Sequence, residues 1–242
     1  MEKEVIFPKA IMLKELIDNF YSEREKNRQQ TKFWITDAGR CPRMIFFKFK
    51  NAPKKGIDPR ILRMFDHGDY IHRLILNALF SVGIVRASEI NIPSQELISG
   101  RADAIISVGD EMYVLDIKSM SSLVFKGLER PKDENVNQLQ LYLHYFNIPK
   151  GILLYVNKDT QDLREFFIEK NQEIIDVLLK ELQDLKNKID SDETPAALTD
   201  RSKNWQCQYC QFKDICSLIG DDILSWENAK NKIEALESKE EQ

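Results

Sequence analysis

The pattern of apolar and polar positions predicts a β-hairpin at residues 98–118, in the middle of the chain. Two apolar runs there flank the turn-forming sequence Val-Gly-Asp-Glu at 108–111, and both are rich in β-branched and aromatic residues. Antiparallel pairing across this turn brings Asp103 and Asp116 to the same end of two neighbouring strands. Since side chains alternate between the faces of a strand, Asp116 and Lys118 leave the same face. The pattern therefore predicts two carboxylates and one ammonium group on one face of a hairpin.

Apolar periodicity elsewhere predicts helices and further strands around the hairpin. Apolar residues recur at helical spacing over residues 8–30, 44–49, 59–80, 132–147 and 171–189. Strand composition is found over residues 84–92, 151–156 and 163–168. The second of these three segments is wholly apolar, which suits the buried interior of a sheet. Along the chain, the predicted order is three strands, a helix and two further strands.

Composition limits the class of protein. A chain of 242 residues, 43% hydrophobic and 31% charged, can bury a full core, and we expect one domain with a satellite. No apolar run approaches the roughly 20 residues of a membrane span, and the first nine residues lack the apolar core of a signal peptide. We therefore expect a soluble, cytoplasmic protein without membrane association.

The overall charge does not indicate nucleic-acid binding. The net charge is −4, whereas the usual footprint of such proteins is a basic excess. Two local basic patches would have to supply that excess. They comprise Lys48, Lys50, Lys54, Lys55, Arg60 and Arg63, and Lys126, Arg130 and Lys132. A solvated surface is the commoner role of such charge runs, so the patches alone do not predict a DNA-binding face.

The hairpin carboxylates have the chemistry of a metal site. Hard divalent cations such as Mg and Mn prefer oxygen ligands, and a neighbouring lysine can orient a water molecule. Alternatively, Asp116 and Lys118 are solvent-facing residues of an alternating strand, but they end a largely apolar run where charges need a reason to be. His72 lies four residues after Gly68 on the predicted helix 59–80, so the two share a face. A lone helical histidine is more often a packed or surface residue than a ligand.

The four cysteines have the spacing of metal ligands. Cys207, Cys210 and Cys216 form a Cys-x-x-Cys-x5-Cys group, and Cys41 stands far upstream. In an intracellular chain this spacing favours metal over disulfides. Four thiolates can hold zinc or a 4Fe-4S cluster, and the grouping of one with three favours the cluster, because zinc ligands usually come as two close pairs. Four unrelated buried thiols are the remaining alternative.

In order and character, the motifs resemble those of RecB-type nucleases of the PD-(D/E)xK superfamily. They are Gly68-x-x-x-His72, Gly100-x-x-Asp103, Asp116-Ile-Lys118 and Gln138-x-x-x-Tyr142. With the cysteine pattern, the chain is similar to the iron-sulfur branch of that superfamily, and most similar to the CRISPR-associated adaptation exonucleases and their viral relatives. Arg-Ala-Asp at 101–103 replaces the Pro-Asp of the superfamily name, but the RecB-type Gly-x-x-Asp form is kept.

The resemblance implies a fold and an organisation. The fold would be α/β and restriction-endonuclease-like, a mixed sheet flanked by helices with a cysteine-ligated iron-sulfur subdomain. Residues 1–58 would form a helical region that contributes one cluster cysteine, and residues 59–190 the nuclease core. Residues 191–242 would hold the cysteine segment and a terminal helix.

The resemblance also implies roles for individual residues. His72, Asp103, Asp116 and the main-chain carbonyl of Ile117 would bind Mg or Mn. Lys118 would assist the attacking water, and Gln138 and Tyr142 would line the substrate path. The 4Fe-4S cluster would be held by Cys41, Cys207, Cys210 and Cys216.

The function expected from these features is metal-dependent hydrolysis of DNA phosphodiesters, by an exonuclease acting on single-stranded or frayed ends. One alternative is a structure-specific endonuclease that processes overhangs in repair or in CRISPR spacer acquisition, with CRISPR integrase proteins as candidate partners. Another is a non-catalytic DNA-binding scaffold whose carboxylate site is vestigial. A zinc-ribbon interaction module on an inactive core is a third.

Overall fold

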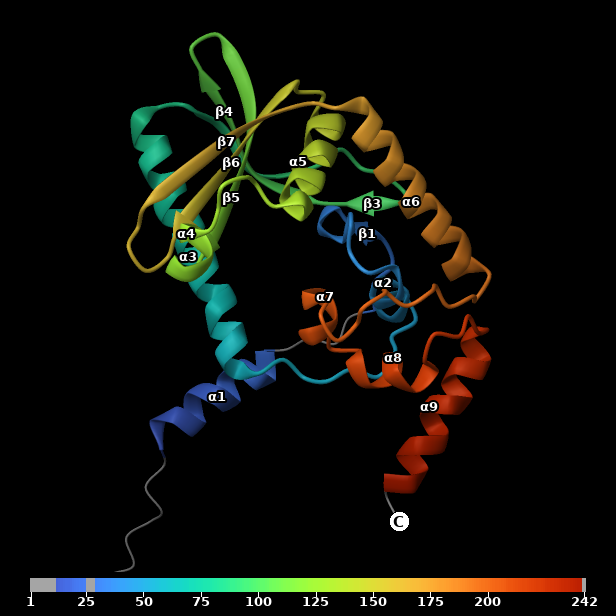
Figure 1. The fold of residues 1–242 in the computed structure, drawn as a ribbon. Coiled ribbons are helices and arrows are strands. Elements are labelled where there is room, and N and C mark those ends of the chain that lie inside the picture. The colour runs from blue at the N-terminus through green and yellow to red at the C-terminus, as the bar shows by residue number, and fades with distance from the viewer. Residues whose placement is uncertain (1–11, 25–28, 241–242) are drawn as a thin grey trace, which may run out of the picture.

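A five-stranded mixed sheet lies at the centre of the molecule (Figure 1). The computed structural model describes residues 12–24 and 29–240, with the backbone alone for 236–240. The strands are β2 (Val85–Asn91), β4 (Arg101–Val108), β5 (Glu111–Met120), β6 (Lys150–Asn157) and β7 (Leu163–Glu169). They run in the order β2-β4-β5-β6-β7, with β5 and β6 parallel and the other pairs antiparallel. The expected mixed sheet is confirmed.

The predicted hairpin is formed by β4 and β5. Gly109 adopts a φ of 60° in the turn, a conformation that costs glycine little. The register pairs Ala104 with Leu115, which places Asp103 opposite Asp116 one step beyond the last paired residues. The alternation of side chains along the two strands and the turn between them therefore suffice to bring the carboxylates of Asp103 and Asp116 together, as the sequence predicts.

Helices cover both faces of the sheet (Figure 1). Helix α3 (Pro59–Val82) begins with Pro59 after an Asp58 cap that accepts from the amide of Arg60, and it ends at Gly83 with a φ of 82°. It packs Ile71 and Leu76 against one face. Helix α5 (Asp133–Phe146) follows the short α4 (Ser122–Lys126) and covers the other face. A Cβ at Gly151 of β6 would lie 2.9 Å from Leu139 of α5, so glycine allows this close approach.

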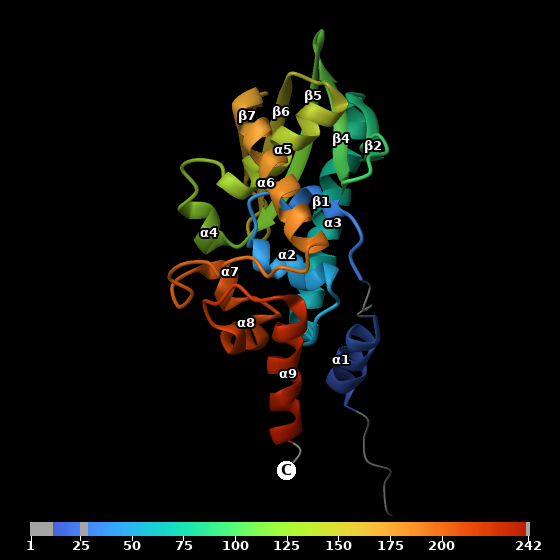
Figure 2. The same ribbon diagram turned by 90° about the vertical axis from the view of Figure 1, so that its right-hand side faces the viewer.

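The C-terminal segment completes its core on the N-terminal half of the chain. Helix α2 (Pro42–Phe49) carries Phe47, whose ring lies 5.6 Å from that of Phe212 and 6.2 Å from that of Trp226. The segment forms α7 (Trp205–Gln208), α8 (Lys213–Ile219) and α9 (Trp226–Glu240), and α6 (Gln172–Asp190) precedes it. Figure 2 shows α8 and α9 beneath α2. One cluster of buried side chains thus includes residues from all three regions expected from the sequence.

The short strand β1 (Phe33–Trp34) was not predicted, and β3 (Ile98–Ser99) is separated from the rest of the predicted hairpin strand. β1 pairs in parallel with β3, and a 3-10 helix, η1 (Ile35–Asp37), follows β1. The apolar run that was predicted as one strand is interrupted at Gly100, where a Cβ would lie 2.7 Å from Ile35. The strand breaks because η1 packs directly on its backbone, a contact between distant segments that local periodicity does not reveal.

Helix α1 (Leu13–Arg24) forms the central part of the predicted helix 8–30. Residues 8–11 and 25–28 of that prediction lie outside the described residues, as do the first nine residues considered for a signal peptide. Polar contacts attach α1 to α3, through Asp18 with Arg63 and through Tyr21 with Asp66. Among the helices that the structure describes, none combines the length and apolarity needed to cross a bilayer.

Candidate functional site

Asp103 and Asp116 lie where β4 and β5 separate. The ladder between the two strands stops at the pair Ala104 and Leu115, so the amide of Ile117 has no carbonyl partner on β4. That amide donates instead to Oδ2 of Asp103, over 2.7 Å. The side chain of Asp103 thereby replaces a ladder hydrogen bond and is fixed beside β5. That the main-chain carbonyl of Ile117 binds the metal stays a prediction.

Lys118 and Gln138 surround the carboxylate of Asp116. The ammonium of Lys118 donates to Oδ1 of Asp116 and to Oε1 of Gln138, each over 3.0 Å. The Gln138 amide lies 3.4 Å from the same Oδ1 and comes from α5, which covers this face of β5. Oδ2 of Asp116 lies 2.8 Å from the lysine nitrogen, yet in the described chain it accepts no hydrogen bond. This buried carboxylate oxygen is therefore held by the charge of Lys118 and not by a hydrogen bond.

His72 approaches the cluster from the opposite face of the sheet. Its Nδ1 lies 3.4 Å from Oδ1 of Asp103. One turn earlier, Gly68 passes β5 so closely that an added Cβ would be in van der Waals contact with Ser119, at 3.5 Å. Glycine thus brings α3 against β5 at the level of the site, and the histidine one turn later reaches Asp103.

The two carboxyl groups have unequal proton affinities. Burial, opposed by Lys118 and aided by Asp103, raises the pKa of Asp116 to about 6. Burial also acts on Asp103, but His72 and the amide of Ile117 outweigh it and lower its pKa. Burial disfavours the charged form of His72, yet the Asp103 carboxylate dominates and raises its pKa.

The donor set fits a hard divalent cation. Two carboxylates from adjacent strands, one with an oxygen that accepts no hydrogen bond, are the ligands that Mg and Mn prefer. No three His, Cys, Asp or Glu side chains in the described chain already form a closed ligand group. Sites for these two metals commonly use one or two carboxylates and complete the shell with water and substrate phosphate, so a closed protein cage is not required.

Gln138 and Tyr142 lie beneath the site rather than on an exposed path. Gln138 is 8% exposed and Tyr142 is 2% exposed. The hydroxyl of Tyr142 donates to the carbonyl of Arg101 over 2.6 Å, and burial raises its pKa. Both residues support the strands and the lysine, because one contacts Lys118 and the other holds the start of β4. The sequence-based expectation was that Gln138 and Tyr142 line the substrate path, and their burial does not match an exposed position along such a path.

A cavity opens beside His72 and Asp103. It has a volume of 550 Å³ and lies between α3 and the strands β2 and β4. Arg73 and Arg101 line it, and Arg101 is paired with Glu89 over 2.6 Å. Local periodicity does not indicate these residues, because the cavity is formed only when α3 crosses β2 and β4.

The four cysteines line one cavity of 370 Å³. Cys41 precedes α2, Cys207 lies in α7, Cys210 follows α7, and Cys216 lies in α8. All four are free thiols in this structure. Burial and the neighbouring cysteines raise the pKa values of Cys41, Cys207 and Cys210. Deprotonated cysteines in this cavity therefore need a bound cation to stabilise their negative charge. The described residues do not form a closed ligand group here either.

A buried arginine lies beside this cavity. The side chain of Arg43 is fully buried and donates to the carbonyls of Pro195, Gly220 and Asp222, at 2.7, 2.5 and 2.9 Å. Its Nη1 also lies 3.8 Å from the sulfur of Cys216. Among the described residues, the hydrogen-bond partners of this guanidinium are carbonyls and one sulfur, none of them a carboxylate, although a buried charge is costly without a counter-charge. A negatively charged centre of thiolates would supply that counter-charge. Arg43 was not predicted as a functional residue, and its position two residues after Cys41 was the available signal.

The first basic patch is largely neutralised. Lys48 pairs with Asp37, Lys50 with Asp192, Lys55 with Asp214 and Arg63 with Asp18. In the second patch, Arg130 pairs with Asp133. The first patch therefore does not supply the local excess of positive charge that was considered from the sequence, whereas in the second patch only Arg130 has a carboxylate partner among the described residues.

The family profile described as the PD-(D/E)XK nuclease superfamily matches residues 12–217. The chain belongs to this superfamily. The CRISPR-associated exonuclease Cas4 of Saccharolobus solfataricus is 29% identical to it over 196 residues, which are 78% of this chain and 89% of that protein. The expected resemblance to the superfamily and to CRISPR-associated exonucleases is confirmed.

Three solved structures share the fold. SSO0001 is 25% identical, with a TM-score of 0.53 over 85% of this chain and 96% of its own. The alkaline exonuclease LHK-Exo of Laribacter hongkongensis is 11% identical, with a TM-score of 0.51 over 73% of this chain and 92% of its own. A phage-related exonuclease from Haemophilus somnus 129PT has the same TM-score, 12% identity and coverage of 72% and 96%. At these identities the last two comparisons concern the fold alone.

Proposed function

We propose that this protein is a divalent-cation-dependent DNA nuclease that degrades single-stranded or frayed DNA from an end. The observation that carries the proposal is the pair of carboxylates, Asp103 and Asp116, on adjacent strands with Lys118 between Asp116 and Gln138. The names of relatives, a CRISPR-associated exonuclease and an alkaline exonuclease, support action from an end. Since the proposed substrate is DNA, we expect this nuclease to be an intracellular, soluble protein.

Each residue of the cluster has a distinct role in the proposal. Asp103, Asp116, His72 and the carbonyl of Ile117 hold Mg or Mn, which would supply Lewis-acid stabilisation of the charge on the phosphate. A protonated lysine has no lone pair and cannot be a ligand, so Lys118 orients the attacking water. Gln138 holds the lysine in place through Oε1. Tyr142 anchors the start of β4, the strand that carries Asp103.

A direct assay tests this function. Single-stranded and double-stranded DNA labelled at one end should be incubated with Mg, Mn or EDTA. We expect release of short labelled products from the single strand with either metal, slower release from blunt duplex and none with EDTA. Cleavage in EDTA, or cleavage of a circular single strand at the rate of the linear one, would contradict a metal-dependent exonuclease. The second outcome would favour the endonuclease, for which CRISPR integrase proteins are candidate partners.

We further propose that Cys41, Cys207, Cys210 and Cys216 hold a 4Fe-4S cluster. The shared cavity and the buried charge of Arg43 support an anionic thiolate centre, and the grouping of one cysteine with three favours the cluster over zinc. Such a centre would connect α2 to α7 and α8, so its binding free energy would be folding free energy.

Replacing Cys216 with alanine should therefore bleach the protein and lower its melting temperature. The measurements are visible absorption and iron content after anaerobic purification, together with thermal unfolding. Ser217→Ala is the matched control, since Ser217 is the exposed neighbour of Cys216. A brown Cys216→Ala protein with the parental melting temperature would remove this cysteine from the ligand set. A colourless parent that contains zinc would overturn the cluster but leave the nuclease site untouched.

A further inference from the structure

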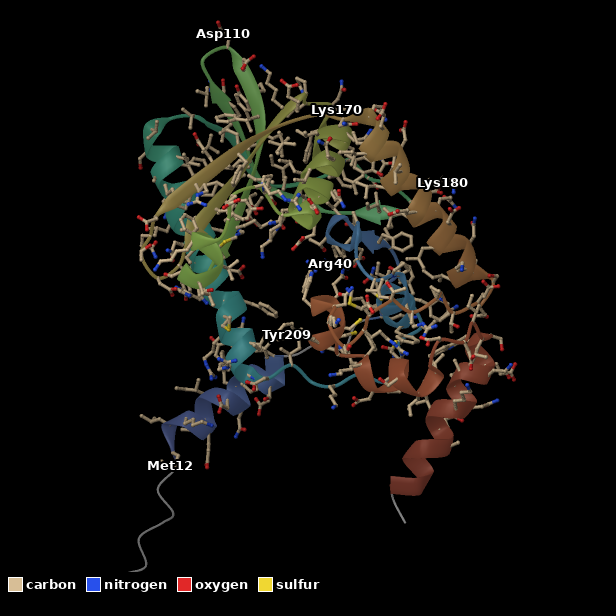
Figure 3. The ribbon with its side chains drawn as sticks, in the orientation of Figure 1. Met12, Arg40, Asp110, Lys170, Lys180 and Tyr209 are labelled. Atoms are coloured by element: carbon tan, nitrogen blue, oxygen red, sulfur yellow. The ribbon has the colours of Figure 1, made fainter. Side chains whose placement is uncertain are left out.

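Three planar side chains adjoin residues that line the cysteine cavity. The guanidinium of Arg40 lies 4.9 Å from the ring centroid of Trp205. Tyr209 follows Trp205 by four residues, and its amide donates to the Trp205 carbonyl, so the two aromatic side chains leave the same side of one helical turn. In Figure 3, Arg40 lies between α7 and the sheet, and Tyr209 lies near the lower end of α7.

These groups are more exposed than a structural stack requires. Trp205 is 48% exposed although Arg40 covers one part of it, and Tyr209 is 82% exposed. Burial in the protein core would have removed this aromatic surface from water. Exposed rings beside an arginine are instead the features on which bases of single-stranded nucleic acid stack.

A short series of contacts connects the loop of Arg40 to the cluster of Asp103, Asp116 and Lys118. Gly39 adopts a φ of 71°, and an added Cβ would lie 2.7 Å from the side chain of Asn137 on α5. The next residue of α5, Gln138, accepts from Lys118. On the other side of the same loop, the amide of Cys41 donates to Gln206 of α7 over 2.9 Å. The loop that carries Arg40 thus lies between α5 and α7 and contacts both.

The charge distribution favours stacking as the source of affinity. The chain has a net charge of −4, and most of the lysines and arginines of its first basic patch are paired with carboxylates. Phosphate contacts dominate binding by basic proteins, and the paired residues of the first patch are less available for such contacts. Stacking needs no charge excess, and it discriminates a single strand from a duplex because paired bases present no free faces.

We propose that Arg40, Trp205 and Tyr209 form a stacking platform for the bases of single-stranded DNA that leads to Asp103 and Asp116. This inference rests on the proposed DNA substrate and names the surface that selects unpaired strands. Bases would stack on the free part of Trp205 and on Tyr209, and Arg40 would hold the first ring in place and face the adjacent phosphate.

Binding to matched strands tests the platform. The probes are a fluorescein-labelled oligothymidylate and a strand of equal length and charge whose sugars carry no bases, with affinity measured by anisotropy in EDTA on the full chain. Tyr209→Ala and Trp205→Leu are each expected to weaken binding of the oligothymidylate by about 5- to 100-fold, the range for loss of one stacked base. Binding of the abasic strand should change by less than about twofold, and Tyr209→Trp should restore affinity.

Two controls keep the result interpretable. Phe167→Ala removes an exposed aromatic ring from β7, one of the two edge strands of the sheet. It should leave the affinities for the oligothymidylate and for the abasic strand unchanged. Visible absorption and melting temperature report whether a substitution near Cys207 disturbs the cysteine centre. Equal losses for both strands, or no loss with oligothymidylate, would overturn the platform and leave a purely structural stack. Because binding is measured in EDTA, this outcome is separate from whether the parent chain cleaves DNA.

Discussion

Replacing Asp116 with alanine is expected to abolish DNA cleavage while the protein remains folded. The carboxylate is buried, carries an oxygen that accepts no hydrogen bond, and lies beside a second carboxylate on the adjacent strand. Its removal takes charge from the metal site but little from the core, because Leu115 and Ile117 keep the apolar packing under α3. Rates on end-labelled single-stranded DNA at saturating Mn measure the effect.

Thermal unfolding adds a readout that does not depend on activity. A ligand that binds the native state raises its stability, so Mn should raise the melting temperature of the parent but not that of Asp116→Ala. In EDTA the variant should remain folded, because relief of the repulsion from Asp103 and loss of the ion pair with Lys118 oppose each other in stability. Asp110→Ala, in the exposed hairpin turn, is the matched control and should behave as the parent does. Substantial cleavage by Asp116→Ala at saturating Mn would refute the site assignment.

Replacing Lys118 with alanine should slow cleavage by about 10² to 10⁴, the usual contribution of a positioned proton-transfer group, while Mn still binds. The ammonium contacts Asp116 and Gln138 and cannot ligate a cation. Its loss removes repulsion of the cation but also favours protonation of Asp116, and these two effects oppose each other in the metal affinity. Calorimetric titration with Mn and single-turnover rates separate binding from chemistry.

Two further variants sharpen this prediction. Lys118→Arg should not fully restore the rate, because the planar guanidinium is larger and points its donors differently. Lys180→Ala removes an exposed lysine of α6 that pairs only with Asp184 among the described residues, and its rate should match that of the parent. If Lys118→Ala cleaved at the parental rate with metal saturating, Lys118 would be an ordinary residue at the end of a strand.

The sequence by itself determined the elements and the central part of the site. The two-residue period of β4 and β5 and the turn between them fix the register, and the register fixes which side chains meet. Asp103, Asp116 and Lys118 could therefore be brought together from local patterns alone. The same holds for α3, α5 and α6, whose apolar faces recur at helical spacing, and for the grouping of Cys207, Cys210 and Cys216.

Tertiary structure decided the contacts between segments that are distant in the chain. The hydrogen bond from Ile117 to Asp103, the burial of Tyr142 and the break at Gly100 each depend on how closely two elements pack. The basic patches had the composition of a binding surface, but folding placed carboxylates beside most of the first patch. Long-range packing also brought Arg43 to the carbonyls of the C-terminal segment and Arg40 to Trp205. The physical reason is that periodicity encodes which face of an element is buried, whereas the identity of the partner across that face depends on the packing of the whole chain.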